Sequence, residues 1–149
     1  MKIEMFLSPE HAIAGLRAPD KMRLLHDLAA RAASTLALPP ERVEQALVKR
    51  EELGSTGVGG GVAIPHARLP ELAHPLGVLA HLRKPIDFDA IDQKPVDVVF
   101  LLLTPAAEQG EHLNALATVA RKLREPERLR DIRSAEGDAA LYLAMTRAI

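Results

Sequence analysis

The sequence predicts an α/β sandwich in which helices cover both faces of one β-sheet. Segments with apolar residues three or four positions apart, which is the helical period, alternate with short apolar runs typical of strands. The run at 96–104 is almost continuously apolar, which favours a strand buried on both faces. Strands that alternate with helices imply helical layers around a single sheet.

The first half of the chain contains two predicted helices. Residues 1–18 predict an apolar start followed by a loop. From Asp20, apolar residues recur with the helical period until Pro39-Pro40 ends that helix and begins the next, since proline suits a first helical turn. The second helix ends at Gly54, a residue type common at helix C-termini.

The second half predicts two strands and three helical segments. The strands are expected at 76–82 and 96–104, with Pro105 ending the second. Pro126 opens a short helical segment, and Ser134 is expected to cap a last helix. The clearest amphipathic helix carries an apolar stripe made of His112, Leu116, Val119 and Leu123.

Composition excludes several classes of protein. The 149 residues, 48% hydrophobic and 26% charged, fit one globular domain over 1–149. Few aromatic residues and a net charge of −1 argue against a nucleic-acid partner. Without cysteine the chain has no disulfide and no thiolate zinc site. No apolar run approaches the ~18 residues of a membrane span, so we expect a cytoplasmic protein with no direct membrane insertion.

The segment 54–68 carries the chemistry. Five glycines fall in the eight residues 54–61, and free N–H groups in such a loop can cradle an anion. Taken alone, a loop of this kind can also be purely structural. It is not a Walker loop, because no Lys-Ser or Lys-Thr follows, and it is a poor dinucleotide fingerprint. His66 follows the glycines, and a histidine beside an anion cradle is a nucleophile towards phosphorus.

His112 and Arg50 complete the candidate set around His66. His112 lies on the inward stripe near the start of its helix, and Arg50 extends the apolar face of the helix before the glycines. A phosphorylated ring brings close to two negative charges, which need hydrogen-bond donors. The alternatives in which these residues have no functional role are that Arg50 is a solvated arginine and that His112 is a packed structural histidine. The residues expected to neighbour the phosphate are Ser55, Thr56 and Gly57.

Other chemistries fit less well. No two histidines share a metal-ligand spacing, so we expect no metal and no cofactor. A serine hydrolase would need a GxSxG motif, which is missing. A glycosidase would need paired acids, for which Asp87, Asp89 and Asp92 are candidates, although aspartates are common in turns. The histidines expected to be solvated are His11, His26 and His74, while His81 can face either way.

Four motifs carry a family resemblance. They are Arg50–Gly57, Gly61–His66, Phe88–Asp97 and His112–Leu116. In this order they resemble the fructose/mannitol type of IIA domain in the bacterial phosphoenolpyruvate phosphotransferase system, most strongly the stand-alone nitrogen-regulatory members (EIIA-Ntr, PtsN-like). The resemblance spans about residues 5–147 and implies a mixed sheet flanked by helices.

The resemblance also implies the roles of individual residues. His66 is the phosphorylated residue, His112 the second active-site histidine, and Arg50 the arginine beside the phosphate. The residue after the phosphorylated histidine, often glycine in relatives, is Ala67 here. This departure leaves the backbone just beyond the site less well defined by the resemblance.

The implied function is that of a phosphocarrier. The protein accepts phosphate from an HPr/NPr-like protein and regulates target proteins according to its phosphorylation state. It acts as a phosphohistidine intermediate rather than as a stand-alone enzyme. The alternative is a sugar-specific IIA component that passes phosphate to a IIB domain; a chain without fused transport modules favours the regulatory branch. A binding module that has lost phosphotransfer is a third reading, which the intact His66 argues against.

Overall fold

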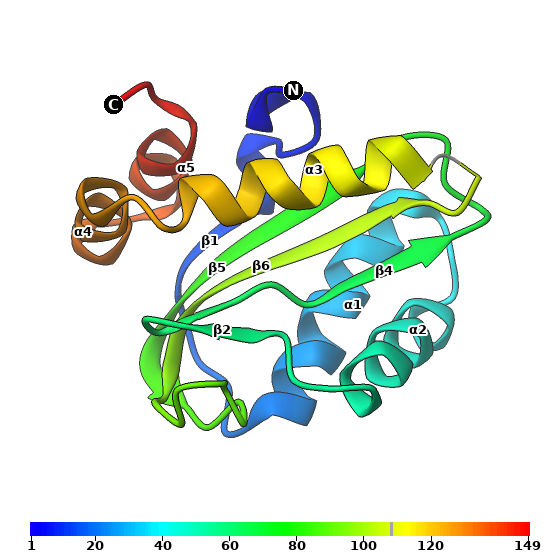
Figure 1. Ribbon diagram of the computed structural model, residues 1–149, viewed down its shortest axis with the longest axis horizontal. Coiled ribbons are helices and arrows are strands. Elements are labelled where there is room, and N and C mark those ends of the chain that lie inside the picture. The colour runs from blue at the N-terminus through cyan, green and yellow to red at the C-terminus, as the bar shows by residue number, and fades with distance from the viewer. Residues whose placement is uncertain (108) are drawn as a thin grey trace.

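Strand β6, Val96–Pro105, is the centre of a six-stranded mixed sheet in the computed structural model, which describes residues 1–107 and 109–149 (Figure 1). Strand β5, Leu76–Ile86, pairs antiparallel with one edge of β6. Two short strands pair parallel with its other edge. These two strands are β3, Val62–Ala63, and β4, His66–Leu69. Two further strands complete the sheet. Strand β1, Ala12–Leu16, is parallel to β5, and strand β2, Gly57–Gly59, is antiparallel to β3.

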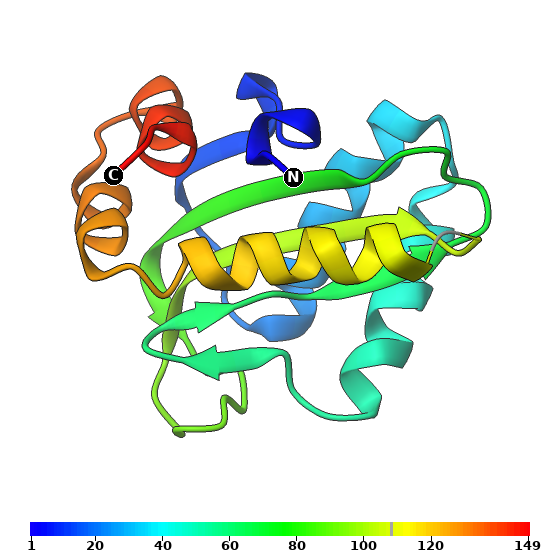
Figure 2. The ribbon, with the colours of Figure 1, turned by 45° about the horizontal axis from the view of Figure 1, so that its top comes forward.

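Helices cover both faces of this sheet (Figures 1 and 2). Helices α1, Lys21–Leu36, and α2, Pro40–Glu52, lie on one face. The other face is covered by α3, Gln109–Lys122, α4, Pro126–Ser134, and α5, Asp138–Thr146, together with two short 3₁₀ turns, Ile3–Met5 and Pro9–His11.

The side chains of β6 alternate between the two hydrophobic cores. Leu101 and Leu103 pack on the side of α1 and α2, whereas Phe100 and Leu102 pack on the side of α3. All four are fully buried. A strand buried on both faces loses its polar alternation, which is why 96–104 reads as a continuous apolar run.

The longer elements confirm the sequence-based expectations. Asp20 caps α1 by accepting a hydrogen bond from the Arg23 N–H over 2.8 Å, and α2 begins at Pro40. The predicted strands correspond to β5 and β6, and the amphipathic helix corresponds to α3. The expected capping role of Ser134 is wrong, because α4 ends at this residue and α5 begins four residues later after Gly137.

The glycine-rich segment forms a hairpin, not the expected anion cradle. Gly59, Gly60 and Gly61 all have positive φ; Gly59 ends β2, and Gly60 and Gly61 make the turn that leads into β3. The Gly60 N–H donates to Asp92 over 3.0 Å, and its carbonyl accepts from Arg133 over 2.7 Å. For Gly60 the prediction was wrong, because its N–H and carbonyl already have partners within the protein.

One histidine expected to be solvated is buried. The ring of His11 lies beneath the protein surface, with Nε2 2.8 Å from the hydroxyl of Thr35 and Nδ1 3.3 Å from that of Ser8. Over residues 1–107 and 109–149, no helix is long and apolar enough to cross a membrane. Within the same ranges, no group of three or more potential ligands is placed to hold a metal ion.

Candidate functional site

His66 stands at the start of β4, where the chain enters the sheet beside β6. It is opposite Leu102 of β6, and the Leu102 N–H donates to the carbonyl of Pro65 over 2.9 Å. The next residue, Ala67, has an ordinary negative φ in the strand and is buried. An alanine is therefore compatible with this backbone, and the side chain of His66 is held at the sheet edge, half-buried.

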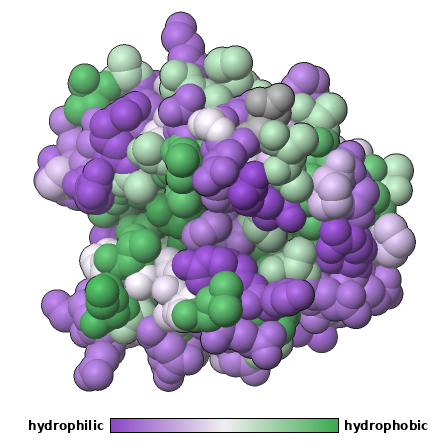
Figure 3. Space-filling model, turned by 45° about the vertical axis from the view of Figure 1, so that its right-hand side comes forward, coloured by the Kyte–Doolittle hydropathy of each residue, from purple (hydrophilic) through white to green (hydrophobic). Residues whose placement is uncertain are grey.

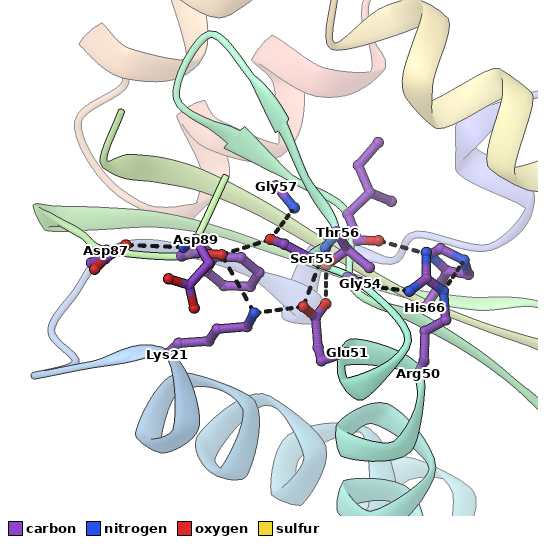
Figure 4. A network of polar contacts seen from close by, with 12 residues as sticks. Lys21, Arg50, Glu51, Gly54, Ser55, Thr56, Gly57, His66, Asp87 and Asp89 are labelled. Carbon is purple, nitrogen blue, oxygen red and sulfur yellow. Dashed lines mark hydrogen bonds and ion pairs between the residues drawn. The ribbon is translucent and has the colours of Figure 1, made fainter. Parts of the chain in front are cut away.

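Two hydrogen bonds define the tautomer of the His66 ring (Figure 4). Nδ1 lies 2.8 Å from the carbonyl oxygen of Ile64. A carbonyl can only accept, so Nδ1 carries the hydrogen and donates. On the opposite side, Arg50 donates through Nε to Nε2 of His66 over 3.3 Å. Nε2 therefore presents its lone pair, which is what a nucleophile requires.

Burial keeps this ring neutral. Desolvation lowers the pKa of His66 below its ordinary value of 6.5. The Ile64 carbonyl and the Glu51 carboxylate act against that lowering, while the positive charge of Arg50 adds to it. Arg50 is itself held by a second hydrogen bond, from Nη1 to the carbonyl of Gly54 over 2.8 Å.

The fold brings His112 to the same place. It lies in the first turn of α3, and its ring centroid is 5.8 Å from that of His66, with the rings tilted by 46°. Its Nδ1 is hydrogen-bonded to the hydroxyl of Thr104, a fully buried residue near the end of β6. Burial, with smaller contributions from His66 and Arg68, lowers the pKa of His112. Both rings are thus neutral at neutral pH.

An open groove of about 500 Å³ surrounds the two histidines. Figure 3 brings the side of the molecule with β4 and α2 forward, where hydrophilic patches run across the middle among hydrophobic ones. No acidic residue is among those that line the groove within the described part of the chain. Its positive lining favours an anionic group. The lining residues are Arg42, Ala46, Lys49, Arg50, Leu53, His66, Ala67, Arg68 and His112.

The residues expected to neighbour the phosphate are engaged with the protein. The hydroxyl of Ser55 donates to the Phe88 carbonyl over 2.6 Å, and the Gly57 N–H donates to that hydroxyl over 3.0 Å. Thr56 is buried, and both its N–H and its hydroxyl donate to Glu51. These bonds stabilise the loop, and a direct contact with phosphate stays a prediction.

Sequence reasoning missed Thr104 and Glu51. Thr104 is a polar residue at the end of an otherwise apolar strand, which signals a specific hydrogen bond. Glu51 lies in the last turn of α2, where the helix dipole disfavours a carboxylate, so its presence also signals a partner. Both signals are visible in the sequence, but neither identifies the partner.

Comparisons with known proteins find relatives over nearly the whole chain. Residues 5–147 match the family model described as "Phosphoenolpyruvate-dependent sugar phosphotransferase system, EIIA 2". A nitrogen regulatory protein of Bradyrhizobium diazoefficiens is 42% identical over 142 residues, 95% of this chain and 93% of the relative. The crystal structure of the nitrogen regulatory protein IIA-Ntr from Neisseria meningitidis has a TM-score of 0.91 at 32% identity, covering 97% of this chain and 99% of that one.

A sugar-specific relative matches a smaller part of the chain. The fructose-specific EIIA component of Haloferax volcanii is also 42% identical, but over 78 residues, 52% of this chain and 51% of the relative. The nitrogen regulatory relatives therefore share nearly the whole chain, whereas this fructose-specific one shares about half.

A pH titration tests the electrostatics of the site. Because the pKa values of His66 and His112 are lowered, we expect ring resonances of both residues, followed by NMR, to titrate with midpoints below 6.5. The unfolded chain takes up these protons at a higher pH than the folded chain. The stability that the neutral rings contribute is thus complete above about pH 6.5 and declines as the pH falls towards the folded pKa values. Midpoints at or above 6.5 would contradict this.

A second test concerns Thr104. Thr104→Val preserves the shape of the side chain but removes the hydrogen bond to Nδ1 of His112. We expect a loss of about 1 kcal/mol in the free energy of unfolding and a change in the tautomer ratio of His112, seen in its ¹⁵N ring shifts. The control is Thr118→Val, which removes a buried hydroxyl on α3 that does not bind His112. It shows how far the loss of a buried hydroxyl lowers the free energy of unfolding without changing the His112 tautomer. Unchanged His112 shifts in Thr104→Val would show that the hydroxyl does not set the tautomer.

Proposed function

This chain belongs to the EIIA 2 family of the phosphoenolpyruvate-dependent sugar phosphotransferase system, and from that membership we propose that it carries a phosphoryl group on Nε2 of His66. The family predicted from the sequence is confirmed, and the nearly full-length nitrogen regulatory relatives favour the nitrogen-related branch over the sugar-specific one. The observation that carries the choice of atom is the hydrogen bond from Nδ1 to Ile64, which leaves Nε2 as the unprotonated ring nitrogen.

The transfer step follows from this geometry. Nε2 of His66 attacks the phosphorus of a donor phosphohistidine, the new N–P bond forms, and the electron pair of the broken bond returns to the donor nitrogen. The His66 ring keeps its Nδ1 hydrogen and gains positive charge. The Ile64 carbonyl stabilises that charge, since a hydrogen bond to the charged form favours it.

Arg50 and His112 act on the phosphoryl oxygens. Arg50 already donates to the nitrogen that receives phosphorus, so its guanidinium is placed to move onto the transferring group. When the hydroxyl of Thr104 donates to Nδ1 of His112, the hydrogen of that ring is on Nε2 and can be donated. Donors of this kind contribute most in the transition state. His112 supports His66 in this scheme and does not carry the phosphate.

The groove suits a protein as the donor. Leu53, 83% exposed, lines it, and Leu113, 55% exposed, follows His112 directly in α3. Exposed apolar residues beside a positively lined groove fit a protein surface that presents a phosphorylated side chain. We assign this role to an HPr/NPr-like phosphocarrier in the cytoplasm, with regulatory target proteins reading the phosphorylation state. A IIB domain is the corresponding acceptor in the sugar-specific alternative.

Replacement of the acceptor is the direct test. We expect His66→Ala to take up no acid-labile phosphate from phosphoenolpyruvate, enzyme I and an HPr- or NPr-like carrier, because among residues 1–107 and 109–149 the ring nitrogen that Arg50 contacts is that of His66. His74→Ala is the matched control and should accept phosphate normally. Phosphate that enters His66→Ala at the wild-type rate would refute the assignment.

The role of Arg50 has its own control in the same groove. Arg50→Ala should slow phosphate uptake about a hundredfold, which is typical for the loss of one transition-state donor. Arg42 also lines the groove, but its guanidinium is paired with Glu71 over 2.8 Å, so Arg42→Ala should have a much smaller effect. Equal effects of the two substitutions would mean that Arg50 contributes only general positive charge.

A further inference from the structure

Glu51 is a buried carboxylate that the transfer step does not use. Its side chain is 5% exposed, and it lies in the last turn of α2. Both features are costly, because burial disfavours a charge and the C-terminal end of a helix disfavours a negative one. Its surroundings therefore have to compensate for the charge.

Two residues provide the compensation. The Lys21 ammonium at the start of α1 lies 2.7 Å from one Glu51 oxygen, and this lysine also lies over the ring of Phe88. Thr56 binds the carboxylate twice, with its N–H over 3.2 Å and with its hydroxyl. The carboxylate thus joins the start of α1, the end of α2 and the loop that follows (Figure 4).

From Thr56 the hydrogen bonds continue to the phosphate acceptor. The carbonyl of Thr56 accepts from the Ile64 N–H over 3.0 Å. The carbonyl of the same Ile64 accepts from Nδ1 of His66 over 2.8 Å. A continuous series of contacts therefore runs from Glu51 through Thr56 and Ile64 to His66. Ile64, whose carbonyl determines the His66 tautomer, is thus held through its N–H by Thr56, the residue that Glu51 holds.

We infer that Glu51 is a positioning residue for His66, which it keeps in the tautomer with a free Nε2 by fixing Thr56 and, through it, the Ile64 carbonyl. This inference rests on the proposed function for its consequence in catalysis, but the tautomer itself is a property of the unphosphorylated protein. An acceptor that holds an imidazole in one tautomer is a recurring device in catalysis by histidine. Here the orienting group is a backbone carbonyl, and the carboxylate acts one step further away.

Adjacent positions on α2 thereby act on the same ring in opposite ways. Arg50 contacts Nε2 directly, and its charge lowers the pKa of His66. Glu51 acts from the other side of the loop, and its charge raises that pKa. The last turn of α2 therefore supplies Arg50 as the donor to Nε2 of His66. It also supplies Glu51, which supports the hydrogen bond at Nδ1 of the same ring.

Two substitutions separate position from charge. Glu51→Ala removes the acceptor for Thr56, so we expect the ¹⁵N ring shifts of His66 in the unphosphorylated protein to change from one tautomer to a mixture, and phosphate uptake to slow about tenfold or more. Glu51→Gln keeps an oxygen that can accept from Thr56. It should restore the single tautomer and most of the rate, although the pKa of His66 falls without the charge.

The neighbouring Glu52, which is exposed, provides the control: Glu52→Ala should match the wild type in tautomer and rate. If Glu51→Ala does not fold, Thr56→Val, which removes only the hydroxyl donated to Glu51, takes its place and is expected to shift the tautomer in the same direction. A folded Glu51→Ala variant with the wild-type tautomer would overturn the inference. Failure of the wild type to accept phosphate would instead refute the proposed function and leave the tautomer result standing.

Discussion

The burial of β6 on both faces is the constraint on which the rest of the structure depends. Every residue from Val98 to Pro105 is buried, so helices have to cover both sides of the sheet. The edge of β6 that faces away from β5 receives β4, which places His66 beside Leu102. The end of the same strand provides Thr104, whose hydroxyl binds His112 from the helix that follows. One strand thus brings together two histidines 46 residues apart in the sequence.

The chemistry of the site depends on which nitrogen of His66 is free. The Ile64 carbonyl is two residues before the histidine, and the intervening Pro65 restricts the backbone between them. This local bond occupies Nδ1 and leaves Nε2 facing Arg50. Burial keeps the ring unprotonated, since desolvation lowers the pKa of His66. Tautomer, protonation state and direction of approach are thus set before any partner binds.

Much of this arrangement could be predicted from the sequence. Helical spacing placed Arg50 and His112 on inward faces, and the glycine-rich segment pointed to His66, beside which the structure places both residues. The short strands could not be predicted in the same way: β2, β3 and β4 have two to four residues, too few to display a period of two. The pairing of β3 and β4 with β6, and of β2 with β3, is a tertiary effect.

The polar partners were beyond sequence reasoning for a related reason. Glu51 and Thr104 are polar residues in unfavourable places, but neither is among the site residues predicted from the sequence, and their contacts with Lys21 and His112 depend on the packing of separate elements. At the glycines 59–61 the sequence instead suggested a functional role that the structure accounts for by backbone conformation. Their composition suggested an anion site, whereas their positive φ angles serve a hairpin turn. Composition alone does not distinguish a free N–H group from one that the fold has already paired.

The measurement that tests the central claim most directly is the identification of the nitrogen that bonds to phosphorus. Protein with ¹⁵N-labelled histidine is phosphorylated through its carrier and examined by NMR for coupling between ³¹P and the ring nitrogens. Coupling to Nε2 of His66, with Nδ1 still protonated and bonded to Ile64, is the predicted result. Coupling to Nδ1 of His66, or to either nitrogen of His112, would contradict it.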